Sequence, residues 1–323
     1  MTKRLAVTGR SEKYSEHGVV EHVHTAASDT RTREVPPSGR TAGETGHMPS
    51  HIFITRRVIM GIEFTKEHHV AKVGLNIPET KNALSPEALL DLYNIWEQCG
   101  KDDDIRVVIL YSALTEIFCS GMDLRTAIPV LTAARKPETE AEKWLVSWGD
   151  AVGTSMLKHK DLDKPVIAAI HGYCLTGGFE MAMGCELRVA SEDAVFQMRE
   201  TTLGIMPVGG SNVFLPMQVG STRAMEILLT GNNFSAATLY DWGFLNRVVP
   251  RHELMDAAMT LAGRIAGNGP TSIRGMVRCA RETRGLSFEE AMRKELEIGM
   301  PIFMSAEARE GVRAQKEKRK PNF

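Results

Sequence analysis

Two short apolar runs most constrain what this chain can fold into. They lie at 105–111 (IRVVILY), which follows acidic residues and is interrupted only by Arg106, and at 166–170 (VIAAI), which is followed by a glycine-rich turn. A strand that is apolar at every position has both faces covered, as in parallel sheets flanked by helices. The two runs therefore predict an α/β fold built around a buried sheet.

The segments around these runs alternate between strand and helix. Apolar alternation predicts strands at 62–64 and 70–75, and a shorter run predicts another at 187–190. Between them, Ser85 is a natural N-cap for a helix that ends at Gly100. Strands that alternate with helices imply crossover connections and an α/β architecture.

After about residue 222 the pattern changes to one helix after another. Helices are predicted at 221–231 and 235–243, each between a capping serine and a terminating glycine, and an apolar stripe predicts a third at 254–265. A mainly helical C-terminal portion is suited to closing a pocket or building an oligomer interface.

The composition is that of a soluble protein. Of 323 residues, 43% are hydrophobic and 24% are charged, and the net charge of −1 offers no general attraction to nucleic acid or to an anionic membrane. No stretch approaches the roughly 20 apolar residues that span a bilayer. The cysteines form no CxxC pair or Cys/His cluster, so we expect reduced, buried thiols in a cytoplasmic protein; they are Cys99, Cys119, Cys174, Cys185 and Cys279.

The first part of the chain differs from the rest. Residues 1–59 are dominated by Ser, Thr, Glu, His and Arg, which predicts a disordered extension, and their acidic content argues against a mitochondrial transit peptide. The compact protein is expected to begin at Met60. The predicted organisation is thus an extension at 1–59, an α/β core at 60–250 and a helical region at 251–323.

Two glycine-containing turns follow the predicted buried strands. The segment 118–124 (FCSGMDL) follows the first, and 171–180 (HGYCLTGGFE) follows the second and opens a helix at Gly178. Glycine lets a backbone amide approach a ligand closely. Such turns are common in α/β proteins, so neither segment alone indicates a function.

Together, in this order and context, the two segments resemble the crotonase family of enoyl-CoA hydratases and isomerases. The resemblance covers roughly residues 60–323 and implies a spiral of ββα repeats followed by a helical C-terminal region that forms trimers. It continues through the shorter motifs NIPE (76–79), NALS (82–85), LGIMP (203–207), LTG (229–231), EG (310–311) and KEKRKP (316–321).

The resemblance also implies a reaction and its site. Chemistry beside a thioester passes through an enolate-like state, and the amides of Met122 and Gly177 would stabilise the negative oxygen. Glu180 and Glu200 would together supply the base and the acid of a hydratase that adds water reversibly to a trans-2-enoyl-CoA, giving a 3-hydroxyacyl-CoA. Simple enoyl isomerases generally lack one of the two glutamates, which favours the hydratase.

Substrate binding is likewise implied by the resemblance. Coenzyme A is part of the substrate, and no metal or redox cofactor is expected. The resemblance places coenzyme A along the main chain near Ala83, Leu84, Ser120, Asp123, Leu124, Arg125 and Gly178, with Arg125 and the basic C-terminal run meeting its phosphates.

Some positions depart from the family pattern. Thr176 stands where a smaller residue is usual, and Arg199 replaces a frequent proline, a change that could displace Glu200. Phe179, together with Met122, is expected to reshape the acyl pocket. Methionines 181, 183 and 198 are expected to line the core or the acyl pocket, and His171 is interpreted as structural.

Two alternatives remain open. The first is an enoyl-CoA isomerase or another enolate-forming acyl-CoA enzyme, such as a dehydratase of a specialised 3-hydroxyacyl-CoA. The second is a noncatalytic relative that binds RNA or CoA, against which the near-neutral charge argues. For the assembly, the resemblance implies a homotrimer or a dimer of trimers. Fatty acid metabolism is the expected setting.

Overall fold

The computed structural model describes residues 57–59, 61–147, 151–158 and 162–323. The chain divides into the units Met1–Ser50 and His51–Phe323, and everything below concerns the second. The predicted extension therefore lies outside the described residues except at its end. There, β1 (Arg57–Ile59) pairs antiparallel with β2 (Ile62–Glu67), so the last three residues of the predicted extension belong to the sheet.

The main sheet has seven strands in the order β1-β2-β3-β5-β8-β10-β13. From β3 onward all neighbouring strands are parallel, as the apolar runs predicted. The strands that follow β2 are β3 (Val70–Leu75), β5 (Val107–Ser112), β8 (Val166–Ile170), β10 (Leu187–Ser191) and β13 (Arg247–Val249).

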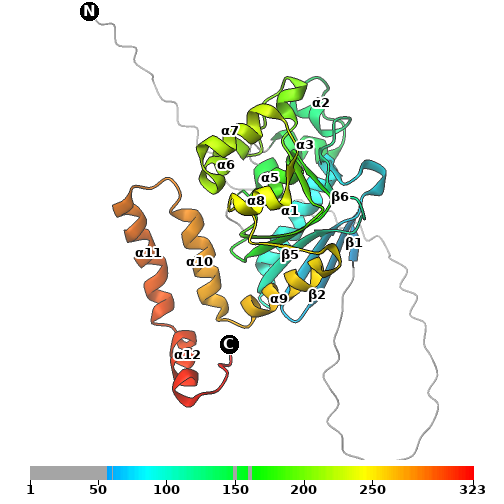
Figure 1. Cartoon of the computed structure of the whole chain (residues 1–323). Coiled ribbons are helices and arrows are strands. Elements are labelled where there is room, and N and C mark those ends of the chain that lie inside the picture. Colours follow the sequence, from blue (N-terminus) through cyan, green and yellow to red (C-terminus); the bar gives the residue numbers. More distant parts are fainter. Residues whose placement is uncertain (1–56, 60, 148–150, 159–161) are drawn as a thin grey trace, which may run out of the picture. The chain divides into compact units, whose positions relative to one another are not determined.

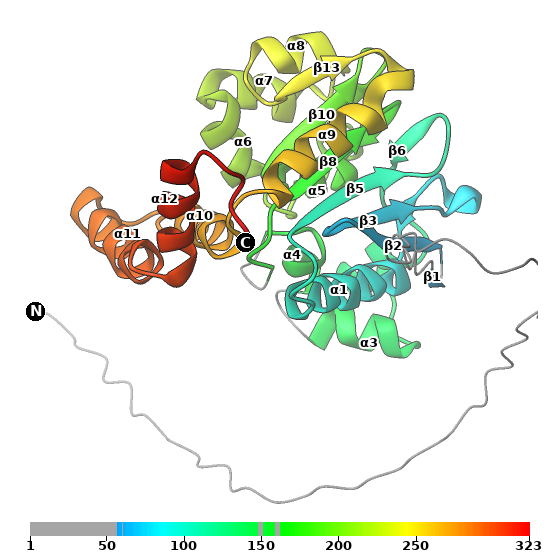
Figure 2. The ribbon, with the colours of Figure 1, turned by 90° about the horizontal axis from the view of Figure 1, so that it is seen from below.

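Both faces of this sheet are covered, because alternate residues of β5 enter different apolar clusters. Val108 and Leu110 pack in the cluster that includes α1 (Pro86–Lys101), whereas Val107 and Ile109 pack against α9 (Leu254–Ala266). Figures 1 and 2 show these two helices on opposite sides of the sheet. The prediction of a strand buried on both faces is confirmed.

Helix α1 begins and ends nearly as its sequence predicts. The Ser85 side chain accepts a hydrogen bond from the amide of Ala88 at 3.2 Å, which caps the helix. The helix continues one residue past the predicted end at Gly100, to Lys101. Its buried Trp96 donates a hydrogen bond to the main-chain oxygen of Ser155, 2.9 Å away, and so joins α1 to α4 (Ala151–Ser155).

A second, smaller sheet carries the two glycine-containing turns. Its strands follow the order β12-β11-β9-β6, and a separate pair joins β4 to β7. Helix α5 (Gly177–Gly184) contacts β6, β7 and β9. The strands of these sheets are β4 (Ala83–Leu84), β6 (Ile117–Cys119), β7 (Gly121–Met122), β9 (Tyr173–Leu175), β11 (Val195–Gln197) and β12 (Phe234–Ser235).

Helices complete the core and form the C-terminal region. Ser235 caps α8 as predicted, whereas α7 has Gly220 as its N-cap, so Ser221 is its first residue and not its cap. The remaining elements are η1 (Pro78–Thr80), α2 (Ala127–Leu131), α3 (Glu140–Ser147), η2 (Glu200–Leu203), α6 (Ser211–Val219), α7 (Ser221–Thr230), α8 (Ala236–Asp241), η3 (Arg251–Glu253), α10 (Pro270–Glu282), α11 (Phe288–Phe303) and α12 (Ala306–Glu317).

The last three helices, α10 to α12, form a helical arm beside the core (Figure 1). Arg281 ties α10 to the core, because its guanidinium donates to Glu186 and to the main-chain oxygen of Leu162. Within the arm lies an open, mostly apolar cavity of about 700 Å³. Several large apolar side chains of the arm are exposed, including Phe288 and Phe303 at 76% and 77%.

Candidate active site

Strand pairing brings the two glycine-containing turns together. β6 runs parallel to β9, with Cys119 opposite Cys174, so the turns that follow these strands leave the sheet side by side. A Cβ added at Gly177 would lie 3.3 Å from the amide nitrogen of Met122, and one added at Gly121 would lie 3.2 Å from the nitrogen of Gly177. The structure therefore places the two predicted donor amides next to each other.

The close contact between the turns depends on glycine. Gly121 has φ +103°, and an added Cβ would lie 1.6 Å from the Oγ1 of Thr176. A Cβ at Gly178 would lie 2.5 Å from the Cβ of Cys119. Both distances are far below any van der Waals contact, so larger residues would force the turns apart.

Thr176 is the departure from the family pattern that lies closest to these amides. It has φ +45° and ψ −116°, a conformation that β-branched residues rarely adopt. Two hydrogen bonds hold it: its amide donates to Gln197 O at 2.8 Å, and its Oγ1 donates to Ser120 O at 3.3 Å. The threonine thus joins one turn to the other.

Gly177 is the first residue of α5. Amides in the first turn of a helix have no acceptor within the helix, and the positive end of the helix dipole favours an anion there. The position of this amide, beside that of Met122, therefore suits a negatively charged oxygen.

Glu180 lies in the first turn of α5 and is 3% exposed. Its Oε1 accepts hydrogen bonds from the Oγ of Ser211 at 2.9 Å and from the Ser211 amide at 3.3 Å. Gly209 leaves room for the carboxylate, because an added Cβ would lie 2.1 Å from Oε2. Burial raises the pKa of Glu180, and the charge of Lys158 and the Ser211 hydrogen bonds oppose that rise.

Glu200 is the first residue of η2, which follows β11 closely, and is 9% exposed. Among the described residues, none donates a hydrogen bond to its buried Oε2. Burial raises the pKa of Glu200 to about 7, and the charge of Glu180 acts in the same direction. The two carboxyl groups therefore interact electrostatically, and Glu200 is a buried group and not a surface charge.

Arg199 is exposed and Glu200 is buried, so the change at position 199 does not turn Glu200 out into solvent. The expectation for Phe179 is wrong. Its ring is fully buried and packs against Phe196 and Phe244, with ring centroids 5.2 and 5.1 Å apart, so it belongs to the core and not to an acyl pocket.

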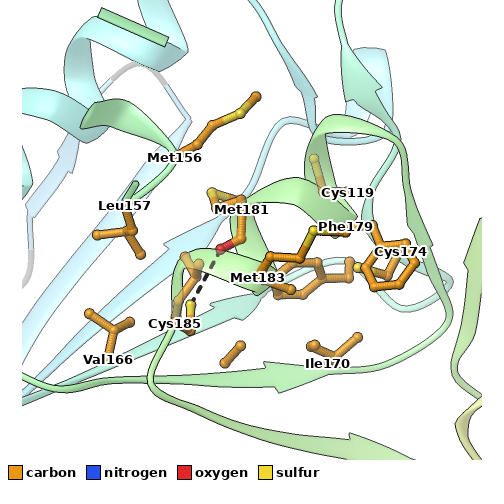
Figure 3. Packing of buried hydrophobic residues seen from close by; sticks show 14 of the residues in the cluster. Cys119, Met156, Leu157, Val166, Ile170, Cys174, Phe179, Met181, Met183 and Cys185 are labelled. Atoms are coloured by element: carbon orange, nitrogen blue, oxygen red, sulfur yellow. Dashed lines mark hydrogen bonds between the residues drawn. The ribbon is translucent and has the colours of Figure 1, made fainter. Parts of the chain in front are cut away.

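Methionines 181, 183 and 198 are buried in the same apolar cluster, which confirms the core interpretation. Figure 3 shows Met181 and Met183 on α5 near Phe179. His171 is buried, and its Nε2 lies 2.6 Å from Leu114 O, in agreement with a structural role.

The cysteines of the described chain are free, and Cys279 alone of them is not fully buried. Burial raises the pKa of Cys119 and of Cys185 to about 12. Thiols this far from ionisation are poor nucleophiles. The sulfur of Cys185 donates instead to Met181 O at 3.6 Å, the dashed line in Figure 3.

Four of the seven residues predicted to bind coenzyme A fall into two pairs. Ala83 and Leu84 pair with Gly121 and Met122 in the β4–β7 ladder, which puts them beside the donor amides. Leu124 and Arg125 lie at the surface, where Leu124 is 61% exposed.

Asp123 and Ser120 are held within the turn that carries Met122. Asp123 is 4% exposed and accepts a hydrogen bond from the Arg125 amide at 2.7 Å, so its side chain shapes the turn. The Ser120 Oγ donates to Thr80 O at 3.2 Å. Gly178 packs against Cys119, the last residue of β6.

Sequence reasoning missed two residues of this site, Ser211 and Lys158. Ser211 is fully buried at the start of α6, and Lys158 follows α4 and donates a hydrogen bond from Nζ to the main-chain oxygen of Glu180. The only signal in the sequence for Ser211 was the glycine pair before it, which lets the chain approach a neighbour closely.

Across the described ranges, no group of three or more His, Cys, Asp or Glu side chains is arranged to hold a metal ion. Nor does any helix in those ranges have the length and apolar character needed to cross a membrane.

Comparison with known proteins connects this geometry to a family. Residues 65–323 match the sequence profile described as enoyl-CoA hydratase/isomerase. Enoyl-CoA hydratase EchA19 of Mycobacterium tuberculosis is 38% identical over 255 residues, which are 79% of this chain and 93% of that protein. The (E)-benzylidenesuccinyl-CoA hydratase of Thauera aromatica is 32% identical over 264 residues, covering 82% and 99%.

A solved structure gives the same result. The crystal structure of an enoyl-CoA hydratase from Bacillus anthracis superposes with a TM-score of 0.71 at 32% identity, covering 84% of this chain and 98% of that one.

Proposed function

Because this chain belongs to the enoyl-CoA hydratase/isomerase family, we propose that Glu180 and Glu200 add water to a trans-2-enoyl-CoA held by the amides of Met122 and Gly177. The chain has the crotonase fold and is an enoyl-CoA hydratase. The addition is reversible and gives a 3-hydroxyacyl-CoA. The roles of the individual residues are the proposal.

The two adjacent amides polarise the thioester carbonyl. As water adds to the β carbon, negative charge moves onto the thioester oxygen, and donors already aimed at that oxygen stabilise it without reorganisation. Loss of one such donor in other enzymes costs about 2.7–4 kcal/mol. The start of α5 adds the positive end of its dipole at Gly177.

The surroundings of the two glutamates indicate which one acts as the base and which one acts as the acid. Glu180 accepts two hydrogen bonds from Ser211, which stabilise its carboxylate form, so it is the base that takes a proton from the attacking water. Glu200 has a buried oxygen with no donor in the described structure and a pKa raised to about 7, so it holds the proton that is delivered to the α carbon. Glu180 takes one proton from water and Glu200 gives one to the α carbon, so the net reaction is the addition of one water molecule.

The observation that carries the proposal is the second buried glutamate beside the first, since a single acid–base residue would suffice for moving a double bond. The test is hydration of crotonyl-CoA, followed as loss of the ultraviolet absorbance of its conjugated thioester, with Glu180→Gln and Glu200→Gln variants. Both variants should lose most activity. Full hydration by Glu200→Gln together with loss of activity in Glu180→Gln would favour an isomerase.

The acyl group is proposed to be chosen by the pocket around these residues, and a screen of CoA thioesters of graded length, with one aryl-substituted thioester, would identify it. The aryl compound is included because the Thauera relative is named for such a substrate. Turnover of a short straight-chain thioester in preference to the others would support the proposed setting in fatty acid metabolism.

We also propose that the chain forms a homotrimer or a dimer of trimers through its helical arm. The support is the exposed apolar surface of α11 and its neighbours, where Leu296, Phe303 and Met304 are 57%, 77% and 61% exposed. Light scattering after size-exclusion chromatography measures the assembly, and a monomer at micromolar concentration would contradict the proposal.

Three further expectations stay predictions. Activity that survives dialysis against a chelator would support a reaction without a metal, and salt-sensitive RNA binding without turnover of CoA esters would revive the noncatalytic alternative. A cytoplasmic location is tested by cell fractionation.

A further inference from the structure

Lys158 contacts the first turn of α5, although it belongs to neither of the two glycine-containing turns. It follows α4, and its Nζ donates a hydrogen bond to the main-chain oxygen of Glu180. Its Cε lies against Gly210, where an added Cβ would come within 3.3 Å of it. The neighbouring Gly209 leaves room for the Glu180 carboxylate in the same way. Two consecutive glycines thus border the ammonium group and the carboxylate.

The ammonium group of Lys158 lies over an aromatic ring that it shares with another cation. Among the described residues, no carboxylate lies within ion-pair distance of its Nζ, which instead sits 4.5 Å from the centroid of the Phe214 ring. The guanidinium of Arg284 lies 5.1 Å from the centroid of the same ring. The negative group that most stabilises the Lys158 ammonium is Glu180 itself.

We propose that Lys158 is a positioning residue for the hydration reaction: it holds the first turn of α5 in place through the Glu180 carbonyl and keeps the Glu180 carboxylate ionised. This inference rests on the proposed role of Glu180 as the base.

The electrostatic part follows from the surroundings of both groups. Burial raises the pKa of Glu180, and the charge of Lys158 is the largest influence that opposes this rise, ahead of the hydrogen bonds from Ser211. Burial lowers the pKa of Lys158 to about 7. The ammonium therefore keeps its charge below pH 7, which is the range in which a buried carboxylate would otherwise take up a proton.

Other titratable groups act on this pair from the elements around it. Arg188 on β10 and Arg284 after α10 lower the pKa of Lys158, whereas Cys185 at the end of α5 is a neutral thiol between pH 5 and 9, because burial raises its pKa to about 12. Glu200 on η2 interacts with Glu180 as a like charge. All of these groups are still present when Lys158 is replaced by an uncharged residue of similar length. The replacement therefore measures the effect of the ammonium charge alone.

The experiment compares wild-type protein with Lys158→Met and Lys158→Arg variants by measuring kcat/KM for crotonyl-CoA hydration between pH 5 and 9. Lys158→Met removes the charge and raises the pKa of Glu180, so the acidic limb of the profile should move up by about one pH unit, which is about a tenfold loss on that limb. Most of the loss should fall in kcat, and Lys158→Arg should restore the limb.

Lys164 supplies the matched control. It is also buried, and its Nζ donates to the main-chain oxygens of Cys99 and Asp102 at 2.7 and 2.6 Å, away from the glutamates. Lys164→Met should lower the melting temperature and leave the acidic limb in place.

The outcomes separate this inference from the proposed function. If the wild type hydrates crotonyl-CoA and needs Glu180, but the acidic limb of Lys158→Met coincides with that of the wild type, the inference is overturned and the function stands. The inference is likewise overturned if Lys158→Arg and Lys158→Met shift the limb equally. If Glu180→Gln is fully active, the proposed function itself fails.

Discussion

The first turn of α5 and the first turn of η2 each contain a buried glutamate, but the hydrogen-bond donors and charges around the two carboxyl groups differ. Glu180 receives two hydrogen bonds from Ser211 and lies near the charge of Lys158, whereas the Oε2 of Glu200 has no donor in the described structure. Burial raises the pKa of both glutamates, but a cation and two hydrogen bonds oppose the rise at Glu180, whereas the charge of Glu180 adds to it at Glu200. What assigns a role to each glutamate is its neighbours, and the predictions below test that difference.

The largest effect is expected for Glu180→Gln. An amide cannot take a proton from water, so kcat/KM for hydration should fall about 10³-fold or more, within the range for loss of a general base. The ultraviolet assay with crotonyl-CoA measures the loss, and an unchanged melting temperature shows that the variant is folded. Retention of a tenth or more of the wild-type rate would show that this turn does not supply the base.

Glu200→Gln should cost about 10²-fold in kcat/KM and change the pH profile on its alkaline side. Wild-type activity should fall as pH rises through about 7, because Glu200 then loses the proton it must donate. The variant should lack that fall. A profile with the same alkaline limb in both proteins would assign the limb to another group.

Stability offers a second test of Glu200. Its folded-state pKa of about 7 lies above the ordinary 4.5, so burial of its charge costs stability increasingly as pH rises from about 4.5 to about 7, and the cost then levels off. Glu200→Gln should therefore melt above the wild type at pH 8, with a difference that shrinks toward pH 5. Calorimetry measures this, and a variant that is less stable at both pH values would argue against an unpaired buried charge.

Gly209→Ala should disturb the carboxylate of Glu180 and leave Glu200 unaffected. The new Cβ would lie 2.1 Å from Oε2 and must push the carboxylate aside, which we expect to reduce kcat/KM about 10- to 100-fold through misplacement. Gly263→Ala on α9 is the matched control, since nothing lies within 4 Å of its new Cβ. Equal activity of the two variants would mean that Glu180 has room to move without consequence.

The smallest effect is expected for Ser211→Ala. It removes the 2.9 Å hydrogen bond to Oε1 but leaves the charge of Lys158 in place, so the pKa of Glu180 should rise modestly. We expect about a three- to tenfold loss near the acidic limb and little loss at pH 8, with the alkaline limb unmoved. A shift of the alkaline limb instead would place Ser211 with Glu200.

Local sequence patterns predicted the elements that carry the glycine-containing turns. The run at 166–170 is β8 with the same bounds, and Ser85 caps α1, because apolar runs and capping residues act through near neighbours in the chain. The family resemblance supplied Glu180 and Glu200, which the structure finds buried and interacting.

Contacts between distant segments were beyond such patterns. Ser211 and Lys158 meet Glu180 only because α6 and the residues after α4 lie against α5, and the glycine pair before Ser211 is the one local sign of it. Phe179 was mispredicted for the same reason: its neighbours Phe196 and Phe244 come from other elements and draw its ring into the core. The roles of the glutamates depend on these long-range contacts.

The central claim is that the amides of Met122 and Gly177 both donate hydrogen bonds to the thioester carbonyl oxygen, with the carboxyl groups of Glu180 and Glu200 beside the same acyl group. It is tested most directly by isotope-edited infrared spectroscopy of crotonyl-CoA, labelled with ¹³C at the thioester carbonyl and bound to a Glu180→Gln/Glu200→Gln double variant that leaves the ligand intact. We predict that the carbonyl stretch moves to lower frequency on binding, as two donors polarise the bond. A bound ligand whose carbonyl absorbs at the frequency seen in water would contradict the claim.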